Sequence, residues 1–282
     1  MADVGGTQPV RDLVAERGPV SIVIPVYDEE EILEQNLATL GAFFDELLGS
    51  GRWLFLLAEN GSTDGTPQVI AEVLRRWPLS RAIHLAEPNY GAALKAGLRA
   101  ATTKWVFLVD VEQWDLPFIR WAWQNRHLYD LLLASKRGDP TICGQSPYRR
   151  LLSCGLNFLQ QLLFGFTGTD THGPKLLNRE ALEPLIDVCQ LDRGHFDTEL
   201  VLRALRRRMR IVEVPFAYED LRPPRNLMIK KIVWNVLALR RLVRAMKDVP
   251  YEGTIRLHRF SREDVLAESE RRPVVAVSER RV

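Results

Sequence analysis

The sequence predicts a Rossmann-like α/β fold, in which a mostly parallel central sheet is flanked by helices. Short apolar runs alternate with segments whose apolar residues recur at helical spacing, which is the pattern of repeated strand–helix units. Acidic and amide residues directly follow several of these runs, at the edge of a parallel sheet where ligands bind. With 282 residues, 46% of them hydrophobic, the chain is long enough for one large domain of this class.

The first half of the chain repeats the strand–helix unit. Residues 20–25 form a β-branched run that ends at a proline, and residues 29–48 carry apolar side chains at helical spacing. A second apolar run over 53–58 leads into a turn in which Ser62 or Asp64 could cap the next helix. The remaining elements expected here are a helix over 68–77, a strand over 82–85, a helix over 92–101 and a fully apolar strand over 105–109.

The second half is less regular. We expect a strand over 131–135, a mostly helical stretch over 148–165, a loop through residue 173, then helices and a final strand over 210–215. Residues 222–247 contain basic residues and no acidic one, and their apolar residues favour one side of a helix. This helix either lies on an anionic membrane surface or packs on the domain with a solvated basic face. The predicted organisation is a flexible leader over 1–19, an α/β domain over 20–222, a basic amphipathic helix over 223–247 and a charged tail over 248–282.

Composition limits the partners and the cellular compartment to be expected for the protein. Lys and Arg number 38 against 36 Asp and Glu, so the net charge of +2 gives no reason to expect a nucleic-acid partner. The three cysteines have no metal-binding spacing, which favours a reducing, cytoplasmic compartment. Residues 1–19 lack the apolar core of a signal peptide, and neither 151–169 nor 232–239 suits a transmembrane helix. We expect a cytoplasmic protein, peripheral on the cytoplasmic membrane face if its basic helix binds lipid.

Polar residues follow the first two predicted strands. Pro25, Tyr27 and Glu29 lie where the first strand gives way to a helix, and a tyrosine face beside a carboxylate could receive a planar base. Glu59 and Asn60 end the second strand, next to glycines that let the backbone approach a ligand closely. Each group also has a structural interpretation, as an acidic helix start or as a capped turn.

Asp110, Val111 and Glu112 follow the apolar strand over 105–109. Carboxylates two residues apart offer hard oxygen ligands to Mg²⁺ or Mn²⁺, and the ion could also bridge a diphosphate. Charges beside a wholly apolar strand are costly unless they are used. We therefore favour a metal site at Asp110 and Glu112 over a merely acidic loop.

Seven segments follow one another in a distinctive order. They are Val-Ile-Pro-Val-Tyr-Asp-Glu-Glu, Asn-Gly-Ser-Thr-Asp-Gly-Thr, Asn89-Tyr-Gly-Ala-Ala-Leu-Lys-Ala-Gly97, Asp-Val-Glu, Ala-Ser-Lys136-Arg137, Lys175-Leu-Leu-Asn-Arg-Glu180 and Phe196-Asp-Thr-Glu-Leu200. Over residues 20–222 the chain resembles the family 2 glycosyltransferases with the GT-A fold, especially the dolichol-phosphate or polyprenyl-phosphate mannose synthase branch. The resemblance implies inverting transfer of a sugar from a nucleotide-diphosphate sugar, assisted by Mg²⁺ or Mn²⁺.

The resemblance also implies roles for individual residues. Those expected around the donor nucleotide and its phosphates are Pro25, Tyr27, Glu29, Glu59, Asn60, Asp110, Val111, Glu112, Lys136, Arg137 and Arg222. Asp110 and Glu112 would hold the metal. The catalytic candidates are Asp197 and Asp170, as bases toward a hydroxyl acceptor, and Arg149, whose guanidinium suits a phosphate. His172 could contact the leaving diphosphate, although a single histidine in a Gly-Pro loop is more often structural.

Several positions depart from the family pattern. Asp28 stands where asparagine is usual, Glu59 and Asn60 replace paired aspartates, and Asp-Val-Glu replaces Asp-x-Asp. The favoured acceptor is a polyprenyl phosphate, which is already anionic and needs no strong base. A soluble hydroxyl acceptor is the alternative, and a non-catalytic nucleotide-sugar-binding protein is a second one.

Overall fold

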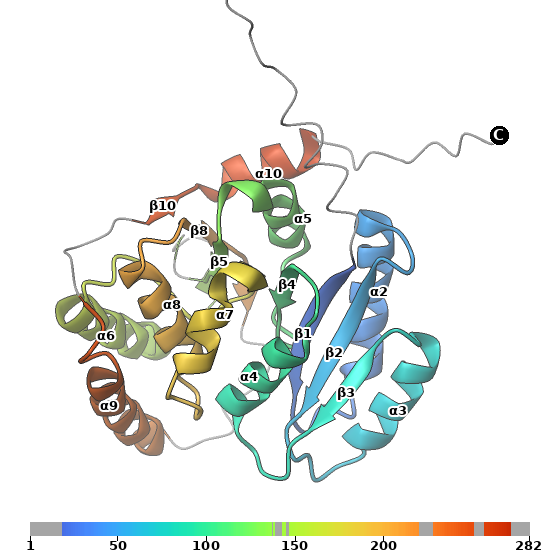
Figure 1. Cartoon of the computed structure of the whole chain (residues 1–282), viewed down its shortest axis with the longest axis horizontal. Helices are drawn as coiled ribbons and strands as arrows, with labels where there is room; N and C mark the ends of the chain where they lie inside the picture. Colours follow the sequence, from blue (N-terminus) through green and yellow to red (C-terminus); the bar gives the residue numbers. More distant parts are fainter. Residues whose placement is uncertain are drawn as a thin grey trace, which may run out of the picture.

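A central sheet organises the computed structural model, which describes residues 19–136, 138, 143–144, 147–219, 228–250 and 257–271. Its eight strands have the order β10-β8-β5-β7-β4-β1-β2-β3, and helices cover both of its faces (Figure 1). Neighbouring strands run parallel except at β7, which is antiparallel to both β4 and β5. The predicted α/β class with a mostly parallel sheet is confirmed.

The N-terminal half alternates strands and helices as the sequence predicted as far as β4, whereas α5 and η1 were not predicted. Its elements are β1 (Val20–Val26), α2 (Leu33–Leu48), β2 (Trp53–Glu59), α3 (Thr66–Arg76), β3 (Arg81–His84), α4 (Tyr90–Ala100), β4 (Trp105–Leu108), α5 (Leu116–Asn125) and the 3-10 helix η1 (Arg126–Leu128). Of the two capping candidates, Asp64 accepts a 3.0 Å hydrogen bond from the Thr66 amide at the start of α3. Ser62 instead accepts one from the Asp28 amide, at 3.1 Å.

The C-terminal half contains strands that the sequence did not reveal. Its elements are β5 (Leu131–Ser135), β6 (Cys143–Gly144), α6 (Pro147–Phe164), β7 (Lys175–Asn178), α7 (Arg179–Val188), α8 (Phe196–Arg206), β8 (Ile211–Pro215), β9 (Tyr218–Glu219), α9 (Met228–Ala245), β10 (His258–Arg259) and α10 (Arg262–Arg271). The missed β7 matters most for the site. Lys175 pairs with Leu108, so β7 begins at the carboxyl end of β4.

Alternate residues of the central strands feed two apolar cores, one on each face of the sheet. Phe107 of β4 packs with Phe44 of α2 in the core that α3 and α5 complete. Leu108 points to the opposite face, where α4, α7 and α8 contribute residues such as Leu98 and Leu200. This alternation follows from the two-residue period of a strand. Both faces of the central strands are therefore buried, and polar ligands have access only at the strand ends.

The predicted charged tail over 248–282 is wrong for residues 257–271, which belong to the folded domain. His258 and Arg259 add β10 to the edge of the sheet beside β8. Helix α10 packs on α5 through the fully buried Val265, and Glu268 accepts a 2.6 Å hydrogen bond from the Trp121 indole. The strand over 210–215 is consequently not the last. Few apolar residues in this stretch make contacts, so its sequence pattern is weak.

The described end of α9 packs on the domain. Leu242 and Met246 are buried in the core beside α8, while Arg240, Arg241 and Arg244 are exposed. Arg203 donates a 2.9 Å hydrogen bond to the Ala245 carbonyl, which fixes the end of the helix. Within the described ranges, no helix has both the length and the apolarity that a membrane span requires.

Candidate functional site

The loops after β1 and β2 are joined by side-chain-to-backbone hydrogen bonds. The Asp28 carboxylate accepts a 2.8 Å bond from the Thr63 amide, and the Glu29 amide donates a 2.8 Å bond to the Thr66 hydroxyl. Asp28 has a φ of 51°, a left-handed conformation that Asp adopts more readily than most residues. Pro25 is buried in β1, and Tyr27 is half-buried directly beyond it. These interactions give the first predicted nucleotide-contacting segment a fixed shape.

Glu59 and Asn60 are each 5% exposed at the end of β2. One Glu59 oxygen accepts a 2.6 Å bond from the Ser62 amide, and the other lies 3.3 Å from His84 Nδ1. Burial raises the pKa of Glu59, but the hydrogen bonds from Ser62 and His84 outweigh it and the net pKa is lowered. Asn60 Oδ1 accepts a 2.6 Å bond from the Asn89 amide. Both side chains thus hold adjoining loops in place.

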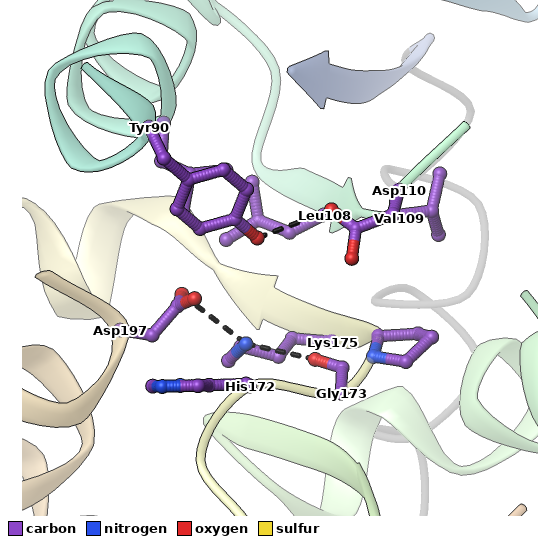
Figure 2. A pocket seen from close by; sticks show the side chains of 10 residues that line it. Tyr90, Leu108, Val109, Asp110, His172, Gly173, Lys175 and Asp197 are labelled. Carbon is purple, nitrogen blue, oxygen red and sulfur yellow. Dashed lines mark hydrogen bonds and ion pairs between the residues drawn. The ribbon is translucent and has the colours of Figure 1, made fainter. Parts of the chain in front are cut away.

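A small pocket opens at the carboxyl end of β4 (Figure 2). Its lining comes from β4, β7, the first turns of α4 and α8, and the loop before β7. The lining residues are Tyr90, Leu94, Leu108, Val109, Asp110, His172, Gly173, Pro174, Lys175 and Asp197. Two predicted site residues, Asp110 and Asp197, are thus brought together from positions far apart in the sequence.

Asp110 is the acidic residue on the β4 side of the pocket. The Tyr90 hydroxyl donates a 3.1 Å hydrogen bond to Asp110 Oδ1, and the second carboxylate oxygen faces the pocket (Figure 2). Burial, followed by the charge of Asp197, raises the pKa of Asp110 to about 6. Burial and the same carboxylates raise the pKa of Tyr90 well above its usual value, so its hydroxyl remains a neutral donor.

Asp197, at the start of α8, forms a buried ion pair with Lys175. Lys175 Nζ lies 3.2 Å from Asp197 Oδ1 and donates a 2.8 Å hydrogen bond to the Gly173 carbonyl. The exposed fractions of the two side chains are 3% and 2%. Burial raises the pKa of Asp197, although Lys175 opposes the shift. The role of Lys175 was missed from the sequence, where its signal was a charge at the head of an otherwise apolar run.

Asp170 and His172 lie on the loop that enters β7. The His172 amide donates a 3.1 Å bond to Asp170 Oδ1, and Lys136 Nζ lies 4.0 Å from Asp170 Oδ2. Burial lowers the pKa of His172 to about 3, so the ring is neutral near pH 7. Its ring centre is 5.9 Å from that of His195. This loop forms the wall of the pocket opposite β4.

The structure does not bring all the predicted site residues into the pocket. Val111 is buried and its carbonyl accepts a 3.0 Å bond from the Trp114 indole, whereas Glu112 is half-buried outside the pocket lining. Arg137 and Arg222 lie outside the described residues, and Arg149 is described only as part of the α6 backbone. In the described parts of the chain, no group of three or more acidic, histidine or cysteine residues is arranged to hold a metal ion.

The arrangement has a definite chemical capacity. Asp110 and Asp197 place carboxylates with raised pKa values near each other, and Lys175 supplies a buried cation beside one of them. A ligand that carries its own cation could be held here because it would offset the repulsion between the two carboxylates, and hydroxyl groups of a ligand could donate hydrogen bonds to them. Such strained charges at the carboxyl ends of a parallel sheet are typical of a ligand site.

Comparisons with known proteins agree with this class of site. The family described as Glycosyl transferase family 2 matches residues 21–117, from β1 into α5. The predicted recognition is confirmed over these residues, which match glycosyl transferase family 2, and the fold agrees with that of GT-A glycosyltransferases.

Two relatives match most of the chain at low identity. Glycosyltransferase AglD of Haloferax volcanii is 26% identical over 213 residues, which are 71% of this chain and 33% of that protein. Dolichyl-phosphate beta-glucosyltransferase ALG5D of Trichomonas vaginalis is 25% identical over 220 residues, 72% of this chain and 66% of that protein. The chain therefore spans less than two-thirds of the length of these relatives.

The solved structures agree in fold. Glucosyl-3-phosphoglycerate synthase from Mycobacterium tuberculosis, in complex with uridine diphosphate, has a TM-score of 0.59 and 17% identity, and the match covers 90% of this chain and 88% of that one. Its complex with Mn²⁺, uridine diphosphate and phosphoglyceric acid has a TM-score of 0.56 and 18% identity, with coverages of 89% and 86%. At these identities the likeness establishes the fold alone.

Proposed function

We propose that this chain is an inverting glycosyltransferase that moves a sugar from a nucleotide-diphosphate sugar to a polyprenyl phosphate. The observation that carries the proposal is the pocket that brings Asp110 and Asp197 together, where burial and then the charge of Asp197 raise the pKa of Asp110. The match to glycosyl transferase family 2 supports sugar transfer. Relatives named as dolichyl-phosphate beta-glucosyltransferases support the class of acceptor.

A divalent cation fits the β4 end of the pocket. Asp110 has a hard carboxylate oxygen facing the pocket, and its pKa is raised by burial and by the negative charge of Asp197, which a cation would offset. Glu112 follows two residues later on the same loop. Mg²⁺ and Mn²⁺ sites commonly use one or two carboxylates and complete their shell with phosphates and water, so a third protein ligand is not required. The bound ion would neutralise charge on the departing diphosphate.

The nucleotide would extend from this ion toward the ends of β1 and β2. Pro25 lies in β1 with Tyr27 and Glu29 in the loop beyond it, while Glu59 and Asn60 support the neighbouring loop. Lys136, at the end of β5, supplies a cation on the other side of the pocket. Arg137, Arg149 and Arg222 remain predicted phosphate contacts.

Whether Asp197 or Asp170 acts as a catalytic base depends on the chemical class of the acceptor. A phosphate acceptor is already anionic, so its oxygen can attack the anomeric carbon as the bond to the diphosphate breaks, and cations must position it. A soluble hydroxyl acceptor would instead need a base, and the buried Asp197 with its raised pKa is the better candidate. The soluble acceptor is thus the alternative function.

We also propose peripheral binding at the cytoplasmic face of a membrane. In the described end of α9 and just beyond it, the exposed residues Arg240, Arg241, Arg244 and Lys247 carry positive charge, and the exposed Asp248 follows them. Each such charge near an anionic leaflet contributes about 1 kcal/mol. Flotation of the full chain with anionic and with neutral vesicles tests this, and equal flotation would contradict it.

A transfer assay tests the function. Purified protein with Mn²⁺ would be given a panel of nucleotide sugars, with a short-chain polyprenyl phosphate in detergent, with a soluble phosphorylated acceptor, or with neither. We expect nucleoside diphosphate release and a glycolipid product only in the first case. Product with the soluble acceptor alone would establish the alternative, and no turnover of any donor would leave a nucleotide-sugar-binding protein.

A further inference from the structure

The buried carboxylate of Glu213 forms hydrogen bonds with the loop that carries Asp170. Glu213 lies in β8 and is 1% exposed. Its Oε1 atom accepts three hydrogen bonds, from the Thr169 amide at 2.6 Å, the Thr169 hydroxyl at 2.9 Å and the Asp170 amide at 3.0 Å. A carboxylate that satisfies three neighbouring donors fixes the position of the backbone that bears them.

The partner of Glu213 comes from the C-terminal segment. Arg259 of β10 lies opposite Glu213 in the strand pairing, and its Nε atom is 3.1 Å from Glu213 Oε2. The Arg259 guanidinium also donates to the Thr167 carbonyl. The Leu257 amide donates a 3.2 Å bond to the Thr167 hydroxyl. Residues 257–259 therefore hold both Glu213 and the start of the same loop.

The same loop continues from Asp170 to residues that line the pocket. Beyond Asp170, the Thr171 hydroxyl lies 2.8 Å from the Thr198 hydroxyl of α8, the residue next to Asp197. His172 and Lys175 then line the pocket itself. A shift of the Asp170 backbone would consequently displace the wall that faces Asp110.

We propose that Glu213 and Arg259 are positioning residues for the sugar-transfer site, acting through the Thr169–Asp170 backbone. Neither lines the pocket, so they affect the reaction only by holding other residues. The kinetic part of this inference rests on the proposed function, whereas the structural part does not. The C-terminal segment that carries Arg259 then contributes to the geometry of the site as well as to the stability of the fold.

Arg259→Met tests the proposal, with Arg259→Lys as the conservative variant. Met retains the apolar stem and removes the cation, so Glu213 loses its partner. We expect the Thr169 and Asp170 amides to exchange hydrogen about tenfold faster. We also expect kcat to fall about tenfold with the donor KM changed by less than about twofold, and Arg259→Lys to recover most of both effects.

Arg262→Met is the matched control. Arg262 also lies in the C-terminal segment and forms an ion pair, but with Asp115 at the start of α5. Arg262→Met should lower the unfolding temperature. It should leave the hydrogen-exchange rates of the Thr169 and Asp170 amides, and kcat, within about twofold of wild type. If Arg259→Met does not fold, Glu213→Gln replaces it, because Gln keeps an acceptor oxygen and loses the charge.

Each outcome decides one claim. Unchanged exchange at Thr169 and Asp170, or faster exchange with an unchanged kcat, would overturn the positioning role. An equal loss of kcat in Arg262→Met would assign the effect to general destabilisation and overturn it as well. If the wild-type protein turns over no donor, the proposed function fails, and hydrogen exchange still decides whether Glu213 and Arg259 hold the loop.

Discussion

Glu59 at the end of β2 and Asp110 beyond β4 are acidic residues at the same edge of the sheet, with β1 between their strands, yet their pKa values shift in opposite directions. The pKa of Glu59 is lowered because the Ser62 amide and His84 bind its carboxylate. That of Asp110 is raised to about 6 because burial and Asp197 outweigh the hydrogen bond from Tyr90. The interactions of the first carboxylate favour its charged form, whereas the surroundings of the second favour its neutral form.

The difference separates a structural acid from a functional one. A carboxylate stabilised by the fold contributes to stability at neutral pH, whereas one held beside like charge reduces stability and is retained for another reason. We propose that in this protein the reason is the binding of a donor and its metal. The predictions below test whether the two strand ends differ in this way.

Lys175→Met should give the largest effect, because it removes the buried cation beside Asp197. Breaking one side of a buried pair costs about 3–5 kcal/mol of unfolding free energy, and the pKa of Asp110 should rise further because Lys175 lowers it. Denaturant unfolding measures the loss. Lys95→Met is the control, since Lys95 is half-buried and donates a 2.7 Å bond to the Cys189 carbonyl; it should cost about 1 kcal/mol. Equal losses would contradict the view that Lys175 balances a strained cluster.

Asp110→Asn should reduce metal-dependent transfer about a hundredfold to a thousandfold, because several kcal/mol of charge stabilisation at the diphosphate are lost. Its stability should change in the opposite sense. Because the folded pKa of about 6 exceeds the unfolded value near 4, the folded state binds more protons between these values, and wild-type stability falls as the pH rises through that window.

Above pH 6 the cost of Asp110 is at most about 3 kcal/mol, and the Asn variant should avoid it. Unfolding experiments from pH 4 to pH 8 in the presence of a chelator would measure the difference between the two proteins. A difference that does not grow as the pH rises from 4 to 6 would refute the assignment of Asp110 as the strained carboxylate.

The sequence predicted the N-terminal half well because its strands are uninterrupted apolar runs. It also named Asp110, from its place after an apolar strand, and Asp197, as a candidate base, among the site residues, and the pocket lining contains both. It did not reveal β7, in which only two apolar residues stand between Lys175 and Asn178, or Lys175 as the cation paired with Asp197. Such contacts arise from tertiary packing, and the pairing of β10 with β8 is another example.

Glu59→Gln should cost about 1–2 kcal/mol at pH 7, because the Ser62 amide loses a charged acceptor. Since the folded pKa of Glu59 is lowered, its contribution is present above the unfolded pKa and is lost as the pH falls through the folded value. The free energy of unfolding of the variant should thus approach that of wild type in acid. This pH dependence has the opposite sign to that of Asp110→Asn.

The control is Glu183→Gln, which removes an exposed ion pair with Arg179 and should change the free energy of unfolding by less than about 0.5 kcal/mol at either pH. A Glu59→Gln protein as stable as wild type at pH 7 would remove the contrast between the two strand ends.

Tyr90→Phe should give the smallest effect and the finest test. The Tyr90 hydroxyl lowers the pKa of Asp110 through its 3.1 Å hydrogen bond, so its removal should raise that pKa and move the window of pH-dependent stability upward. The change in unfolding free energy should stay below about 1 kcal/mol, since a neutral donor is lost from a group that can protonate instead. Carboxyl carbon NMR of the protein in the presence of a chelator measures the Asp110 titration directly.

The control is Tyr129→Phe, since Tyr129 lies outside the pocket lining and the loss of its hydroxyl should leave that titration unchanged. A fall in the Asp110 pKa in Tyr90→Phe would mean that the hydroxyl does not stabilise the ionised carboxylate.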